Sequence, residues 1–92
     1  MEHLSIKVYG KVQGVYFRKH TREKANELGV KGWVKNEDDG TVEIAAEGEK
    51  PVLEEFLKWC YIGPEGALVK RVDFSWGDMK GYNDFEFIDE FA

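Results

Sequence analysis

Short runs of alternating hydrophobic and polar residues predict β-strands along the chain. Leu4, Ile6 and Val8 alternate with polar residues up to Gly10, which is the two-residue period of a strand with one buried face. A hairpin is predicted further on, because a turn that ends in a glycine separates two such runs. That turn is 37–40, and the later predicted strands are 32–36, 42–47, 71–76 and a short final strand through 85–87.

Two other segments repeat apolar residues at helical spacing. Phe17, Thr21, Ala25 and Leu28 form one stripe, and Gly29 follows as the residue that ends the helix, since glycine adopts a left-handed backbone at little cost. The second helix is predicted to have a proline in its first turn and to end at a Gly-Pro pair. The proline is Pro51, the helix ends at Gly63-Pro64, and its stripe consists of Val52, Leu53, Phe56, Leu57, Cys60 and Tyr61.

The predicted order is strand, helix, strand, strand, helix, strand, followed by a short edge strand. This order is typical of an α+β fold, the ferredoxin-like sandwich (βαββαβ), in which two helices cover one face of an antiparallel sheet. The length of 92 residues predicts one domain, residues 1–92. We expect the other sheet face to be largely solvated and to carry Ser5, Lys7, Glu43, Glu47, Lys70 and Asp73.

Composition excludes several classes of protein. Cys60 is the single cysteine, which excludes an internal disulfide and a multi-cysteine metal site. No apolar run approaches the roughly 20 residues of a membrane-spanning helix, and the N-terminus does not resemble a secretory signal. We therefore expect a cytoplasmic protein with no membrane partner. The net charge of -5 disfavours a nucleic-acid partner. An RNA-binding sandwich would need several exposed aromatic residues on its central strands, and Tyr9 is the only clear candidate in the sequence.

Positive charge is concentrated in the first third of the chain, where it can attract a small anion. Residues 1–36 contain eight Lys or Arg and three acidic residues. Within them, residues 10–18 place glycines before the first helix, so that amide N–H groups at its N-terminus can surround an anion. Arg18 can direct its guanidinium into the same place. The spacing alone favours a simpler interpretation, a tight turn with Arg18 on the surface.

Asn36 ends the second predicted strand, beside the turn. If this strand pairs antiparallel beside the first strand, its end lies near the glycine loop, and the Asn36 amide can reach the same anion. Asparagine is also common at strand ends and in turns. Considered alone, Asn36 is therefore better interpreted as a turn residue.

Two longer motifs resemble the signatures of the acylphosphatase family. The resemblance extends over nearly the whole chain and is strongest between residues 8 and 48. The first motif is Val8-x-Gly10-x-Val12-Gln13-Gly14-Val15-x-Phe17-Arg18, and the second is Gly32-Trp33-Val34-Lys35-Asn36-x-x-x-Gly40-x-Val42, with Gly48 six residues later.

The resemblance implies a ferredoxin-like fold and hydrolysis of the carboxyl-phosphate bond of acyl phosphates, with no required metal or other cofactor. It marks Arg18 as the phosphate anchor, Asn36 as the residue that orients water, and the loop amides as the phosphate cradle. The implied phosphate-binding loop consists of Gln13, Gly14, Val15, Tyr16, Phe17 and Arg18. We expect an acyl phosphate as substrate, phosphate or sulfate as a ligand of the site, and a monomeric protein.

The chemistry of acyl phosphates agrees with these roles. A carboxylate leaves without a proton, so the protein has to position water and stabilise negative charge on the phosphoryl oxygens. Asn36 accepts no proton near neutral pH, so its role is geometric and little pH dependence is expected there. His20 is the rival base, but it lies about 200° from Arg18 around the helix. We expect His20 to be solvated or bonded to a partner.

Other interpretations remain open at this point. A non-catalytic anion-binding or regulatory module on the same fold would bind phosphate without turnover. An acylphosphatase-like domain that opens a large carbamoyl-transferring maturation protein is disfavoured, because no zinc-type cysteines follow up to Ala92.

Cys60 is expected to be a buried small hydrophobe, and Tyr16 and Trp33 either line the mouth of the hollow or pack in the core. The acidic tail departs from the family pattern, and we expect Asp89 and Glu90 to point away from the anion.

Overall fold

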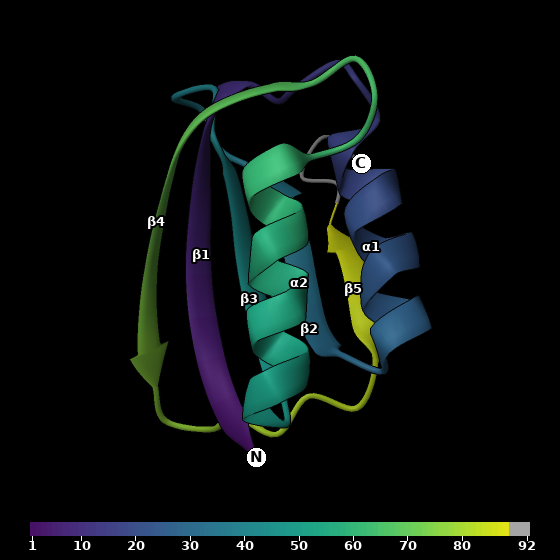
Figure 1. Cartoon of the computed structure of the whole chain (residues 1–92), viewed down its shortest axis with the longest axis vertical. Helices are drawn as coiled ribbons and strands as arrows, with labels where there is room; N and C mark the ends of the chain where they lie inside the picture. Colours follow the sequence, from purple (N-terminus) through teal and green to yellow (C-terminus); the bar gives the residue numbers. More distant parts are fainter. Residues whose placement is uncertain (89–92) are drawn as a thin grey trace.

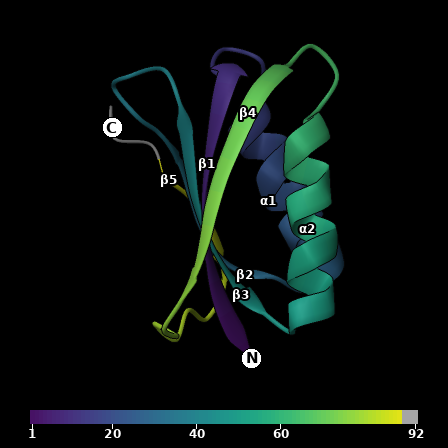
Figure 2. The same cartoon turned by 60° about the vertical axis from the view of Figure 1, so that its left-hand side comes forward.

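Five strands form one sheet, and two helices cover one of its faces (Figures 1 and 2). The structure is a computed structural model that describes residues 1–88. Along the chain, its elements are β1 Glu2–Lys11, α1 Phe17–Leu28, β2 Lys31–Asn36, β3 Val42–Gly48, α2 Lys50–Ile62, β4 Leu68–Gly77 and β5 Phe85–Ile88. The predicted order of elements and the two-layer α+β sandwich are confirmed.

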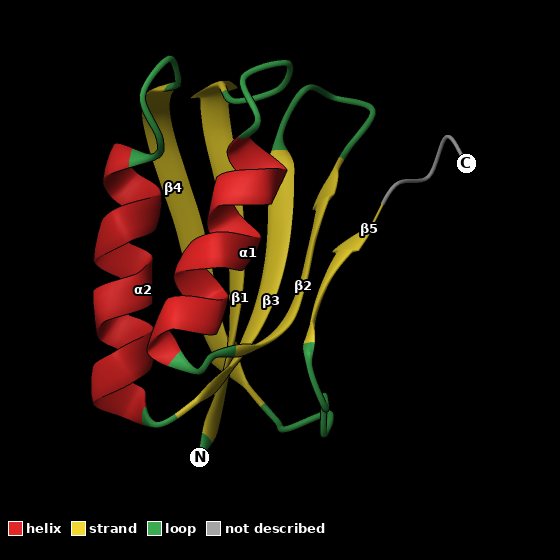
Figure 3. Ribbon diagram, turned by 90° about the vertical axis from the view of Figure 1, so that its right-hand side faces the viewer, coloured by secondary structure: helices red, strands yellow, loops and turns green. Residues whose placement is uncertain are grey.

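The strand order across the sheet is β4-β1-β3-β2-β5. β1 pairs antiparallel with β3 and β4, and β2 pairs antiparallel with β3. β5 pairs parallel with β2, so the sheet is mixed where an antiparallel sheet was expected. β2 does not lie beside β1, because the other strand of the hairpin, β3, lies between them. Figure 3 shows β5 at the sheet edge beyond β2, and α1 packs against both of these strands.

The core lies between the helices and the sheet and follows the predicted stripes. α1 buries Phe17, Thr21 and Ala25 against it, and α2 buries its own apolar residues in the same way. The α2 stripe is narrower than expected, since Tyr61 is 50% exposed. The fully buried positions of α2 are Leu53, Phe56 and Cys60, and burial raises the pKa of the Cys60 thiol. Cys60 is thus a buried small hydrophobe, as expected.

Glycine is required at two points of this framework. Gly29 ends α1 with φ 76°, and its N–H donates to the carbonyls of Ala25 and Asn26, which is the glycine stop that the pattern predicted. Gly32, with φ 143°, lies against β3, where a Cβ would collide with the carbonyl of Ala45. A side chain at position 32 would therefore push β2 away from β3.

The outer face of the sheet departs from expectation at Glu47. This residue was expected to be solvated, yet it is 1% exposed. The connection between β4 and β5 folds over it, and its carboxylate accepts hydrogen bonds from the amides of Lys80, Gly81 and Tyr82. Alternation identifies the face of the sheet on which a residue lies, but it does not show which loop covers that face.

Neither α1 nor α2, the helices of residues 1–88, is long and apolar enough to cross a membrane.

Candidate active site

A hollow of about 490 Å³ opens where the loop after β1 meets the start of α1, the end of β2 and β5. Three segments that are distant in sequence, residues 12–22, Asn36 and Phe87, therefore contribute to one site. None of its nine lining residues is acidic. They are Val12, Gly14, Tyr16, Phe17, Arg18, Lys19, Arg22, Asn36 and Phe87.

The loop between β1 and α1 leaves several of its amide groups without a hydrogen-bond acceptor among residues 1–88. Gly14 has φ 74°, and Tyr16, the residue before α1, has φ 59°, a backbone that non-glycine residues adopt at a cost of about 1–3 kcal/mol. Within the described part of the chain, the amides of residues 14–18 donate no hydrogen bond. They also lie at a helix N-terminus, which carries about half a positive charge. This arrangement favours a bound anion.

Two contacts with β5 hold Arg18 in place. Its Nη1 donates to the carbonyl oxygen of Ile88 at 3.1 Å, and its Cζ lies 4.5 Å from the centroid of the Phe87 ring. A guanidinium has five N–H donors in a fixed plane. One contact to Ile88 therefore fixes the orientation and leaves donors for a second oxygen ligand in the hollow.

The side-chain carbonyl of Asn36 has an unusual environment. Its Oδ1 is buried and has no hydrogen-bond partner among residues 1–88, although Asn36 lines the hollow. A buried acceptor without a partner costs about 1–3 kcal/mol, and in native proteins such an atom calls for an explanation. Because Asn36 lines the hollow, a turn of its amide would let a water molecule or a ligand there supply the missing donor.

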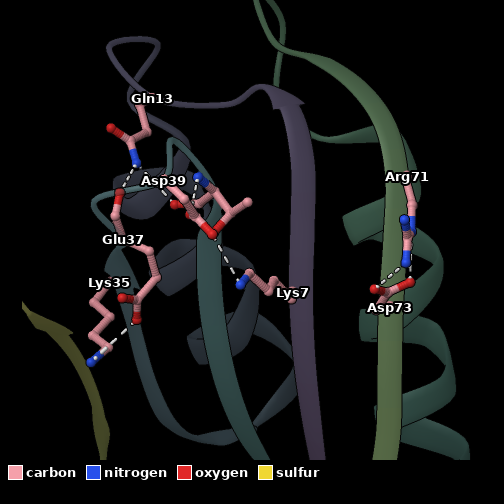
Figure 4. Close-up of polar contacts among 8 residues, drawn as sticks. Lys7, Gln13, Lys35, Glu37, Asp39, Arg71 and Asp73 are labelled. Atoms are coloured by element: carbon pink, nitrogen blue, oxygen red, sulfur yellow. Dashed lines mark hydrogen bonds and ion pairs between the residues drawn. The ribbon is translucent and has the colours of Figure 1, made fainter.

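Two hydrogen bonds from Gln13 hold the turn after Asn36 close to the first loop, although β2 does not lie beside β1. The Gln13 Nε2 donates to the carbonyls of Glu37 at 2.8 Å and Thr41 at 2.9 Å, so the first loop is joined directly to the turn between β2 and β3 (Figure 4). Within that turn, hydrogen bonds from Thr41 and the nearby Lys7 lower the pKa of Asp39 to about 2. The turn that follows Asn36 is therefore held at both ends.

The predicted site residues fall into two groups. Gly14, Tyr16, Phe17, Arg18 and Asn36 line the hollow. Gln13 and Val15 do not line it: Gln13 contacts the turn, and Val15 is half-buried against the core.

Four lining residues were not singled out from the sequence: Val12, Lys19, Arg22 and Phe87. The excess of positive charge in residues 1–36 was a signal for Lys19 and Arg22. Phe87 has no local signal, because it is brought in by the sheet.

The rival candidates lie elsewhere. His20 is exposed, its Nδ1 lies 3.1 Å from the Glu23 carboxylate, and it does not line the hollow. Trp33 does not line the hollow either, since its Nε1 donates to the hydroxyl of Tyr82. Among the residues that the structure describes, no group of three or more His, Cys, Asp or Glu side chains could hold a metal ion. The expectation for Asp89 and Glu90 lies outside the described residues.

Comparisons with known proteins agree with the geometry. A family model described as Acylphosphatase matches residues 4–87. A relative called acylphosphatase from Pelotomaculum thermopropionicum is 49% identical over 76 residues, 83% of each chain. The crystal structure of an acylphosphatase from Bacillus subtilis has a TM-score of 0.94 at 34% identity and covers 97% of this chain and 100% of that one. An acylphosphatase structure from Coxiella burnetii has a TM-score of 0.92 at 39% identity, with 95% and 92% covered.

Proposed function

The chain belongs to the acylphosphatase family, hydrolases of acyl phosphates, and we propose that the hollow lined by Arg18 and Asn36 is its active site. The observation that carries the proposal is the buried, unpartnered Asn36 Oδ1, which shares one hollow with the Arg18 guanidinium and the free amides of residues 14–18. An acceptor and a set of donors are what in-line attack of water on a phosphoryl group requires.

In this mechanism the phosphoryl oxygens accept hydrogen bonds from the loop amides and from Arg18. These donors are fixed before the substrate binds, so they stabilise the charge of the transition state without reorganising. The Asn36 Oδ1 accepts a hydrogen of the attacking water and turns the water's lone pair toward phosphorus. The products are a carboxylate, which needs no proton to leave, and inorganic phosphate.

A benzoyl phosphate assay tests the site. Arg18→Ala should lower kcat/KM by about 10³-fold, the effect of losing a principal donor to the transition state, with the melting temperature near that of the wild type. Arg71→Ala is the matched control, because Arg71 is an exposed arginine on the far edge strand β4. Including a chelator tests the expectation that no metal is required. Near-normal turnover by folded Arg18→Ala would contradict the assignment.

The remaining properties belong to the same proposal. Inorganic phosphate and sulfate should occupy the hollow and inhibit competitively, since they present the same oxygens as the substrate. We also propose that the protein works in the cytoplasm as a monomer of one domain. Phosphate oxygens accept hydrogen bonds, so a site that only binds phosphate needs donors. The Asn36 oxygen is an acceptor and would have no function in a non-catalytic anion-binding module.

A further inference from the structure

The hollow carries more positive charge than one phosphate requires. Lys19 and Arg22 line it together with Arg18, and none of the three forms an ion pair with a carboxylate among residues 1–88. The acidic residues of α1 that are nearest in sequence to these three cations pair with other side chains. Glu23 pairs with His20, and Glu27 pairs with Lys24. This cluster of cations is therefore not neutralised within the described part of the chain.

One aromatic ring holds two of these cations. The Cζ atoms of Arg18 and Arg22 lie 4.5 Å and 5.5 Å from the centroid of Phe87, so the two guanidiniums are separated by no more than the sum of these distances. Like charges at positions i and i+4 of a helix destabilise it. Stacking on the ring keeps Arg22 close to Arg18 despite that repulsion, and an anion bound beside Arg22 would relieve it.

The hollow also has an apolar part. Val12, Phe17 and Phe87 line it together with the exposed ring of Tyr16, and its volume of about 490 Å³ is that of a site for a small organic molecule rather than for one phosphate group. A short carbon skeleton can therefore lie beside the phosphoryl group, with its far end near the helix cations.

We propose that Arg22, assisted by Lys19, binds a second negative charge on the acyl group, so that this chain favours acyl phosphates whose acyl part carries a carboxylate or a phosphate. The inference rests on the proposed active site, because it assumes that Arg18 and the loop amides hold the reacting phosphoryl group. Arg22 is a specificity residue in this scheme, so its charge should matter more for an anionic acyl group than for a neutral one.

A matched pair of substrates tests the proposal, namely 4-carboxybenzoyl phosphate and benzoyl phosphate, each corrected for its rate without enzyme. For the wild type, kcat/KM should be higher for the carboxylated substrate, and the advantage should shrink as salt is raised. Arg22→Gln should reduce the ratio of the two kcat/KM values about tenfold, mainly through KM. Lys19→Gln should reduce it less, because ammonium groups bind carboxylates without the bidentate geometry.

Two variants serve as matched controls. Arg71→Gln and Lys58→Gln remove exposed cations that do not line the hollow, so they report the effect of net charge alone. The proposal is overturned if Arg22→Gln leaves the ratio of the two substrates unchanged. It is also overturned if Arg22→Gln lowers both substrates equally, since Arg22 would then act through Arg18. Failure of the wild type to hydrolyse benzoyl phosphate would instead overturn the active site itself.

Discussion

Two buried polar groups lie at opposite ends of the β2–β3 hairpin, and they differ in how fully they are bonded. Glu47, near the end of β3, accepts hydrogen bonds from His3 Nδ1 at 2.6 Å and from three amides of residues 80–82. Asn36, at the end of β2, has a buried oxygen with no partner among residues 1–88. A saturated acceptor stabilises the fold, whereas an unsaturated one keeps its capacity for a ligand.

The two ends of the hairpin are also connected. Glu47 holds the segment 80–82, which leads directly into β5, and β5 carries the contacts to Arg18. Burial by itself raises the pKa of Glu47, but the hydrogen bonds from the amides and from His3 outweigh it and lower the pKa to about 2. The carboxylate is therefore charged at neutral pH and keeps the connection to β5 in place.

The largest expected effect is on stability, at Glu47. Glu47→Ala should lower the free energy of unfolding by about 3 kcal/mol, because it leaves His3 and three amides without their buried acceptor. Measured well below the melting temperature, kcat for benzoyl phosphate should fall no more than a few-fold, because Glu47 does not line the hollow and acts on it only through β5. Urea unfolding of Glu47→Ala and of Glu86→Ala, an exposed glutamate on β5, makes the comparison. Equal stability of the two variants would show that the Glu47 contacts are dispensable.

Asn36→Ala should have the reverse pattern. We expect kcat to fall about 100-fold, roughly 2.7 kcal/mol, because water is no longer oriented. The free energy of unfolding should stay within about 0.5 kcal/mol of the wild-type value or rise, because removing this oxygen leaves no hydrogen-bond donor unsatisfied. Asn26→Ala, on the exposed side of α1, is the control. A loss of stability equal to the loss at Glu47 would make Asn36 a structural residue.

Acid should weaken the Glu47 end of the hairpin selectively. The pKa of Glu47 is about 2 in the folded protein, against an ordinary value of 4.5, so its charged form stabilises the fold above pH 4.5 and this contribution is lost as pH falls toward 2. The stability difference between wild type and Glu47→Gln should shrink over that window, by up to about 1.4 kcal/mol per pH unit. Chemical denaturation at several pH values measures it. If the stability difference between wild type and Glu47→Gln did not change with pH, the low pKa would not belong to Glu47.

The same contrast shows what the sequence could predict. Periodicity identified every element in order, because each helix and strand has its own hydrophobic pattern. It could not give the parallel pairing of β5 or the place of β3 between β1 and β2, which depend on residues far apart in the chain.

The active site divides in the same way. Arg18 and Asn36 stood in local motifs, but the contact between Arg18 and Ile88 spans 70 positions and has no local signal. Glu47 matched the pattern of a solvated face until residues 80–82 covered it.

The smallest expected effect concerns the contacts that hold the turn after Asn36 in place. Gln13 joins the first loop to the turn after Asn36 through two hydrogen bonds, at 2.8 Å and 2.9 Å. Gln13→Ala should lower the free energy of unfolding by about 1 kcal/mol and reduce kcat/KM for benzoyl phosphate several-fold, because Asn36 is then held less firmly relative to Arg18. Gln13→Glu keeps the shape but places a carboxylate against the two carbonyl oxygens, so it should lower activity at least as much as Gln13→Ala. If both variants kept full activity, the position of Asn36 would be set by the sheet alone, and the Gln13 contacts would matter for stability but not for catalysis.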